Sequence, residues 1–112
     1  MTYLLALLLT LAIEVPLVAW IYPGERVRLA IACGVTTTAT HLTMHHVLPL
    51  VLASSGQVLV IGEAMALIVE AAVYAGVSRT RSVGRALVAS AVANAVSYGV
   101  GITLLWLVVA PG

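Results

Sequence analysis

Acidic and histidine side chains lie inside the long apolar runs of this 112-residue chain, where ionisable groups are least expected. They are Glu14, Glu63, Glu70, His41, His45 and His46. An ionisable group inside a bilayer is expensive, and such groups commonly mark an ion pathway or a binding site. We therefore expect these side chains to face the interior of a helical bundle rather than the lipid.

The composition requires a membrane protein. Hydrophobic residues make up 62% and charged residues 8% of the chain, with a mean hydropathy of +1.16, which excludes an ordinary soluble domain. A bilayer-spanning helix needs about 20 mostly apolar residues. The sequence predicts one domain over 1–112, an all-α polytopic four-helix transmembrane bundle. Its predicted spans are about 2–22, 27–53, 57–78 and 85–110.

The basic residues predict the orientation. All five lie in two short breaks between the apolar runs: Arg26, Arg28, Arg79, Arg81 and Arg85. Basic residues near span ends stay on the cytoplasmic side. We therefore expect these two connections in the cytoplasm of a bacterial cell and the protein in its inner membrane. Both termini and the turn at 54–57 would then lie outside.

The two halves of the chain show a related polar pattern at shifts of 56 or 57 residues. The matched pairs are Glu14 and Glu70, Arg28 and Arg85, Cys33 and Ser90, Thr37 and Asn94, and Thr40 and Ser97. This pattern predicts two similar helical hairpins, about 1–54 and 57–110, related by an axis along the membrane normal. Chance matching within an alanine- and valine-rich sequence is the alternative.

Helical rise places several polar residues at one depth. At about 1.5 Å per residue, most of them come out roughly 12–14 Å from the cytoplasmic span ends, near the midplane. The predicted ion- or proton-binding residues are Glu14, Glu70, Asn94, Thr37 and Ser97. Two membrane carboxylates at one depth can share a proton or bind a cation. The alternative is a set of neutral, hydrogen-bonded side chains that only hold the helices together.

The histidines suggest a second kind of site. His41 and His45, four residues apart on a helix, present two imidazoles on one face, as ligands of a divalent transition metal do. His46 and Glu63 are the further candidate ligands, and no other cofactor is expected. The alternative is a histidine pair that hydrogen-bonds the glutamates or lies at the outer interface.

Two family resemblances accompany these patterns. The chain resembles small four-span bacterial membrane proteins in three places: Glu14-x-Pro16 in the first span, Glu63-x(6)-Glu70 with Tyr74 in the third, and Arg85-Ala-x(3)-Ser90-x(3)-Asn94-x(2)-Ser97-x(3)-Gly101 in the fourth. This resemblance implies a family with a shared polar pattern, but it does not indicate any particular activity. The chain is also similar to small multidrug resistance transporters in its length, its four predicted spans and the glutamate of its first span, Glu14. The glycine and tryptophan pattern of that family's third span is missing, so drug efflux is not carried over.

The sequence favours a small transport or permeation protein with a proton- or cation-binding layer at the bilayer midplane. A non-catalytic accessory or assembly subunit of a larger membrane complex is the alternative. An intramembrane metal-binding protein or metalloenzyme ranks third, because no nucleophile or complete ligand set is visible. The expected partners are the lipid bilayer and either further copies of the chain or a larger membrane complex. No basic patch points to nucleic acid.

Overall fold

The computed structural model describes the backbone of residues 3–109 and the side chains of 4–54 and 56–104. These residues form helices and no strands, so the predicted all-α class is confirmed. The elements are α1 (Tyr3–Ile21), α2 (Arg26–His46), the single turn α3 (Leu48–Val51), α4 (Ser55–Val77) and α5 (Val83–Val109). Positions 2 and 110, the outermost residues of the predicted spans, lie outside the described residues.

The sequence predicts one span over 27–53, but the helix in this part of the chain is broken. α2 ends at His46, and α3 follows after Val47. Pro49 lies in the first turn of α3, where its missing N–H is harmless. The same residue would have removed a hydrogen bond from the middle of a continuous helix. This explains why the long helix stops before it.

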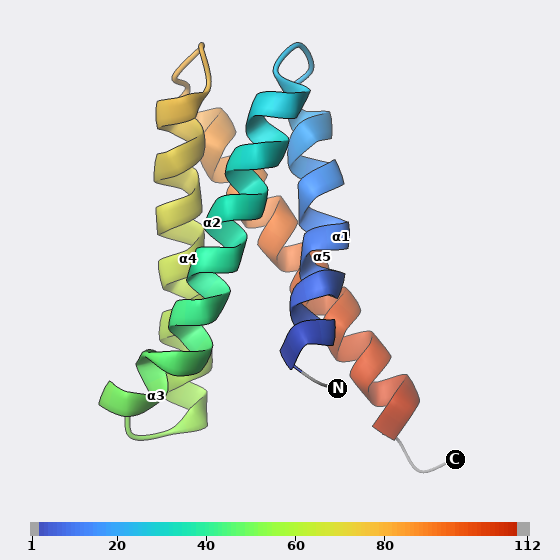
Figure 1. Ribbon diagram of the computed structural model, residues 1–112, viewed down its shortest axis with the longest axis vertical. Coiled ribbons are helices and arrows are strands. Elements are labelled where there is room, and N and C mark those ends of the chain that lie inside the picture. Colours follow the sequence, from blue (N-terminus) through green and yellow to red (C-terminus); the bar gives the residue numbers. More distant parts are fainter. Residues whose placement is uncertain (1–2, 110–112) are drawn as a thin grey trace.

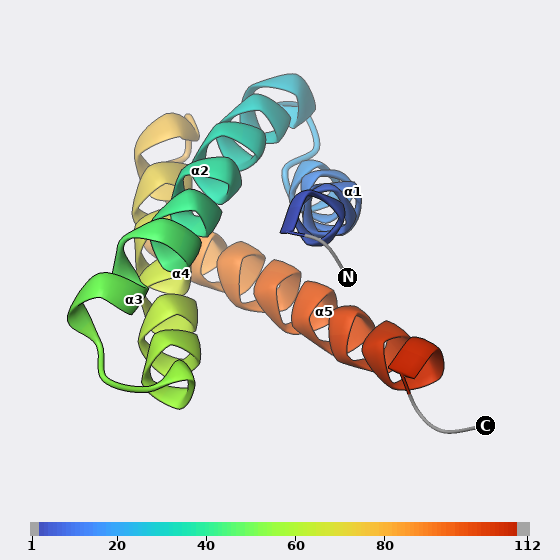
Figure 2. The same ribbon diagram turned by 60° about the horizontal axis from the view of Figure 1, so that its bottom comes forward.

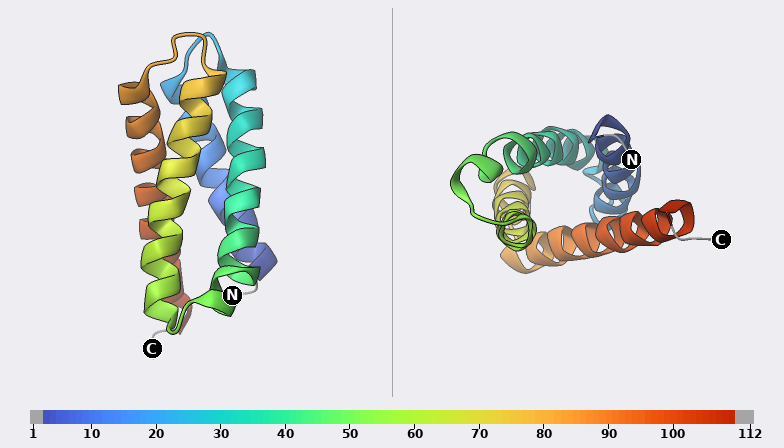
Figure 3. Two further views of the ribbon diagram at one scale, coloured as in Figure 1. Left: turned by 90° about the vertical axis from the view of Figure 1, so that its left-hand side faces the viewer. Right: turned by 90° about the horizontal axis from the view of Figure 1, so that it is seen from below.

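Four long helices form a ring in the order α1, α2, α4, α5. α1 and α4 each pack against both α2 and α5, and they lie diagonally across the ring from one another (Figures 1 and 3). The two arginine-containing loops lie at one end of the bundle, and α3 lies at the other. α5 runs obliquely, beside α4 near the loops and beside α1 at the far end (Figure 2).

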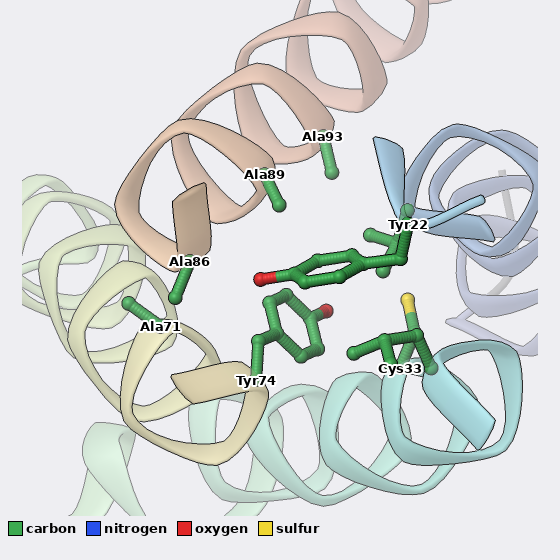
Figure 4. Close-up of a cluster of buried hydrophobic side chains, with 9 residues drawn as sticks. Tyr22, Cys33, Ala71, Tyr74, Ala86, Ala89 and Ala93 are labelled. Atoms are coloured by element: carbon green, nitrogen blue, oxygen red, sulfur yellow. The ribbon is translucent and has the colours of Figure 1, made fainter. Parts of the chain in front are cut away.

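The core lies toward the loop end of the bundle. It consists of Val18, Tyr22, Leu29, Cys33, Ala71, Tyr74, Ala86, Ala89 and Ala93 (Figure 4), which we call the tyrosine cluster. The α5 contribution is entirely alanine, and small residues let helices approach closely in membranes. The tyrosine rings fill the space that the alanines leave, so this end of the bundle is closed.

The outer surface is strongly apolar. Trp20, Val27 and Leu50 expose 72%, 74% and 82% of their surfaces, whereas Glu14 and Glu70 expose 1% each. Soluble monomers rarely show large apolar patches on the outside. α1, α4 and α5 are each long and apolar enough to cross a membrane.

The two arginine loops are fastened to one another. Glu25, between α1 and α2, accepts a hydrogen bond from the backbone N–H of Arg79 at 2.7 Å and one from the Ser78 hydroxyl at 2.8 Å. The Arg79 N–H and the Ser78 hydroxyl lower the pKa of this partly exposed carboxyl, and the nearby Arg79 and Arg28 charges lower it further. The contact holds the two hairpins together at the loop end.

Candidate functional site

Glu14 of α1 and Glu70 of α4 reach across the ring toward each other. Their carboxyl groups lie within hydrogen-bonding range, and both side chains are almost completely buried. A hydrogen bond between two carboxyl groups needs a proton, because two carboxylates have only acceptor atoms. The pair can thus share one proton, or it can hold a cation in the proton's place.

Hydroxyl groups from both neighbouring helices bind Glu14. The Ser97 hydroxyl of α5 donates to Oε2 at 2.7 Å, and the Thr37 hydroxyl of α2 donates to Oε1 at 3.3 Å. Both donors were predicted to belong to this layer. Together they fix the carboxyl group from two sides and leave it facing Glu70.

Asn94 and Tyr74 bind Glu70. The Asn94 amide and the Tyr74 hydroxyl each donate to Oε1 at 3.4 Å. The same Asn94 amide donates to the Ser90 carbonyl at 2.8 Å, and the Ser90 hydroxyl donates to the Leu67 carbonyl at 2.8 Å. Asn94 is therefore positioned by its own helix and by α4 before it contacts the carboxyl group.

Two residues outside the predicted site, Cys33 and Tyr74, extend this network toward the loops. Cys33 lies with Tyr74 in the tyrosine cluster, and its sulfur is 3.7 Å from the Thr37 hydroxyl. The Cys33 side chain is fully buried. The sequence contained one signal for this position: Thr37 follows Cys33 by four residues, and residues four apart share a helix face.

A cavity of about 360 Å³ lies beside the carboxyl pair, which we call the inner cavity. It is lined by Thr10, Glu14, Thr40, His41, Met44, Glu63, Ala66, Glu70, Asn94, Ser97, Tyr98, Gly101 and Ile102. Its lining follows α1 and α5 away from the loops, from Glu14 to Thr10 and from Asn94 to Ile102. The tyrosine cluster fills the bundle on the loop side of the pair.

The predicted metal ligands do not form a complete set. The His41 and His45 rings stack with their centroids 6.5 Å apart and an interplanar angle of 11°. His41 and Glu63 line the inner cavity, whereas His45 and His46 are exposed. Among the described residues, no three histidine, cysteine, aspartate or glutamate side chains come together to hold a metal ion. Metal binding stays a prediction from the sequence.

No protein family, curated protein or solved structure matches the chain. The site joins a buried acid pair, a set of hydrogen-bond donors and a cavity that extends away from the basic loops.

Proposed function

We propose that the chain is a small transport or permeation protein of a bacterial inner membrane, in which Glu14 and Glu70 exchange protons or bind a cation. The contact between these two buried carboxyl groups carries the proposal. Simple packing would be served as well by apolar side chains, because replacing buried charged groups by apolar ones is often neutral or stabilising. An acid pair that lines a cavity has access to the ions that it would exchange.

We also propose that α2 is a fourth span. Its 21 residues reach about 31 Å, enough for the hydrocarbon core. It packs between α1 and α4, both of which are apolar enough to span. Its two arginines lie in its first turn at the loop end, and buried residues such as Thr37 and Thr40 face inward. Protein neighbours would therefore shield much of its polar surface from lipid.

Matched contacts support a duplicated hairpin. Within the first hairpin Thr37 donates to Glu14, and within the second Asn94 donates to Glu70. Between the hairpins, Arg28 donates to the carbonyl of Val77 at the end of α4 at 3.4 Å. Arg85 in turn lies 5.8 Å from the centre of the Tyr22 ring, just after α1. Matched residues thus contact the other half of the chain in similar places, which supports the proposed pseudo-twofold axis, although Arg28 binds a backbone carbonyl and Arg85 an aromatic ring.

Transport would need access from both sides of the membrane. The inner cavity reaches Glu14 and Glu70 from the end opposite the arginine loops, and the tyrosine cluster blocks the other side. In the proposed mechanism this cluster loosens when the proton or cation on the acid pair changes. Tyr74 belongs to both parts, because its ring lies in the cluster and its hydroxyl contacts Glu70.

Burial of the acid pair favours transport over the accessory-subunit alternative. A subunit that uses glutamates to dock a partner would present them on its outer surface. Glu14 and Glu70 instead point into the bundle, where only small ions or ligands could reach them.

The test is flux through proteoliposomes that contain a trapped pH dye. We expect the wild-type protein to exchange protons for Na⁺, K⁺ or tetramethylammonium. The Glu14→Gln/Glu70→Gln double variant should lose at least about 90% of this rate, since the amides cannot release a proton. Glu25→Gln is the matched control, because it makes the same change outside the bundle interior. A double variant with the full wild-type rate, or a wild-type protein that moves none of these ions, would refute the proposal.

A further inference from the structure

The loop end of the bundle carries a pocket lined by basic side chains, which we call the arginine pocket. Its volume is about 370 Å³. Its lining residues come from both arginine loops and the start of α2: Gly24, Glu25, Arg26, Val27, Arg28 and Arg79. Three guanidinium groups against one carboxylate give this lining a net charge of +2. The inner cavity shares none of these residues, so the proposed chemistry of the acid pair leaves the pocket unused.

Two of the three arginines have their guanidinium groups free for a ligand. Arg28 is partly engaged, since its guanidinium donates to the Val77 carbonyl at 3.4 Å. Those of Arg26 and Arg79 donate no hydrogen bond to any residue that the structure describes. A guanidinium group has five N–H donors in a planar fork that matches the oxygens of a phosphate. The pocket therefore offers unused donors of the type that binds phosphate groups.

Glu25, the acid of the pocket lining, is occupied by the contact between the loops. Its Oε1 accepts from the backbone N–H of Arg79, and its Oε2 accepts from the Ser78 hydroxyl. This contact fixes the loop that carries Arg79 against the start of α2, which carries Arg26. The arginines of both loops are thus held around one pocket before any ligand binds, which lowers the cost of ordering them.

The surface beside the pocket favours a lipid as the source of the phosphate. Val27 lines the pocket, and Ile31 and Val35 follow it at intervals of four residues, so the three share one face of α2. All three are exposed, which leaves an apolar stripe that begins at the pocket. Trp20, in the last turn of α1, is exposed as well, and tryptophan rings favour the headgroup level of a bilayer.

We infer that the arginine pocket binds the phosphate of an anionic phospholipid, with an acyl chain along Val27, Ile31 and Val35. The ligand is a phosphodiester with an uncharged headgroup alcohol, as in phosphatidylglycerol. The ammonium group of a choline or ethanolamine lipid would instead meet the positive charge of the pocket. A phosphate that contacts Arg26 and Arg79 together would join the same two loops that Glu25 joins. The inference goes beyond the proposed function, because site and ligand are both different.

A lipid is favoured over dissolved phosphate because the bilayer holds its headgroup at the level of the pocket. Confinement to the interface gives a group a far higher effective concentration than it would have in solution. Each basic residue near an anionic membrane surface strengthens binding by about fivefold. The two free arginines should therefore be enough to distinguish an anionic lipid from a zwitterionic one.

Native mass spectrometry shows which lipid stays bound to the full chain when it is released from nanodiscs. The nanodiscs contain equal parts of phosphatidylglycerol and phosphatidylcholine with the same acyl chains. We expect the wild-type protein to retain phosphatidylglycerol with a preference of at least about tenfold. Arg79→Gln keeps the backbone N–H that binds Glu25 and should reduce this preference by about fivefold. Arg26→Gln, on the other side of the pocket, should have the same effect.

Arg81→Gln is the matched control. It removes the same charge from the same loop, two residues further on, but Arg81 does not line the pocket. We expect it to change the preference by less than about twofold, because an exposed charge outside the pocket is screened by salt. Arg26→Gln decides the question if Arg79→Gln does not fold.

Equal retention of the two lipids by the wild-type protein would refute the inference. Equal effects of Arg79→Gln and Arg81→Gln would also refute it, because the total charge of the loops would then attract the lipid and the pocket would have no special role. Calorimetry with inorganic phosphate, on the protein in lipid-free micelles, tests the other source. We expect no binding there, and phosphate binding that Arg79→Gln abolishes would assign the pocket to a dissolved anion instead of a lipid.

Discussion

Replacing Tyr22 by phenylalanine should stabilise the bundle, although it removes a polar group from a core made of side chains from all four long helices. The Tyr22 hydroxyl is buried and has no hydrogen-bond partner among the described residues. Its ring lies against Tyr74, with the hydroxyl on the side of the α5 alanines Ala86 and Ala89 (Figure 4). A buried hydroxyl without a partner costs about 1–3 kcal/mol in proteins. Phenylalanine removes this cost and keeps the ring beneath Arg85.

The substitution also leaves a small void where the hydroxyl oxygen was, which reduces the gain in stability. We therefore expect the free energy of unfolding to rise by about 1 kcal/mol. Tyr74→Phe is the matched variant, because it removes the same group from the same cluster. It loses the hydrogen bond to Glu70 and the contact with Cys33. We expect it to lower the free energy of unfolding by about 1–2 kcal/mol.

Reversible unfolding in mixed micelles, driven by sodium dodecyl sulfate and followed by circular dichroism, measures both variants. The reasoning predicts changes of opposite sign from the two substitutions. If Tyr22→Phe destabilises the protein as much as Tyr74→Phe does, the Tyr22 hydroxyl has a partner in the folded protein. Water would then reach the tyrosine cluster, and the proposal that this cluster closes the loop side of the bundle would be wrong.

Two other substitutions test the contacts around the cluster. Ser97→Ala removes the 2.7 Å hydrogen bond to Glu14. It should lower the free energy of unfolding by about 1–3 kcal/mol in the same assay, since it leaves a buried acceptor with one donor fewer. A change near zero would mean that water replaces this hydrogen bond. Glu25→Gln should destabilise the protein at neutral pH, because the folded pKa of Glu25 lies below its ordinary value of 4.5. The stabilisation is present above 4.5 and is lost as the pH falls through the folded pKa, so the wild-type and variant stabilities should converge in acid. A difference that persists at low pH would show that charge is not its cause.

The all-helical bundle and the inward placement of Glu14 and Glu70 follow from the sequence because strong physical constraints determine them. Backbone groups in lipid must bond within their own segment, which leaves helices as the solution for apolar runs of this length. A buried carboxyl group avoids lipid wherever a protein interior is available. Residue depth then follows from helical rise alone, which explains why Thr37 and Asn94 reach the acids.

The packing of Cys33 beside Tyr74 could not be predicted in the same way. Cys33 and Tyr74 meet only because α2 and α4 are neighbours in the ring, and a sequence does not specify which faces of two helices come together. The sequence also gives no sign of the groove that Ala64 of α4 and Ala95 of α5 help to line, since both are ordinary residues for a membrane helix. The histidine spacing, by contrast, suggests a metal site that the described residues do not complete. It places His41 and His45 side by side but cannot supply the third ligand.

The acid pair connects stability to the proposed transport. α1 and α4 lie diagonally across the ring, so the contact between Glu14 and Glu70 acts directly between the two hairpins. With one shared proton the two groups attract one another. With none, two unit charges about 4 Å apart repel by about 4 kcal/mol at an effective dielectric constant near 20. An energy of that size is enough to shift the packing of one hairpin on the other, and Tyr74 would carry the shift from Glu70 into the tyrosine cluster. A bound cation would offset the same repulsion, so proton and cation would compete for one pair of carboxyl groups.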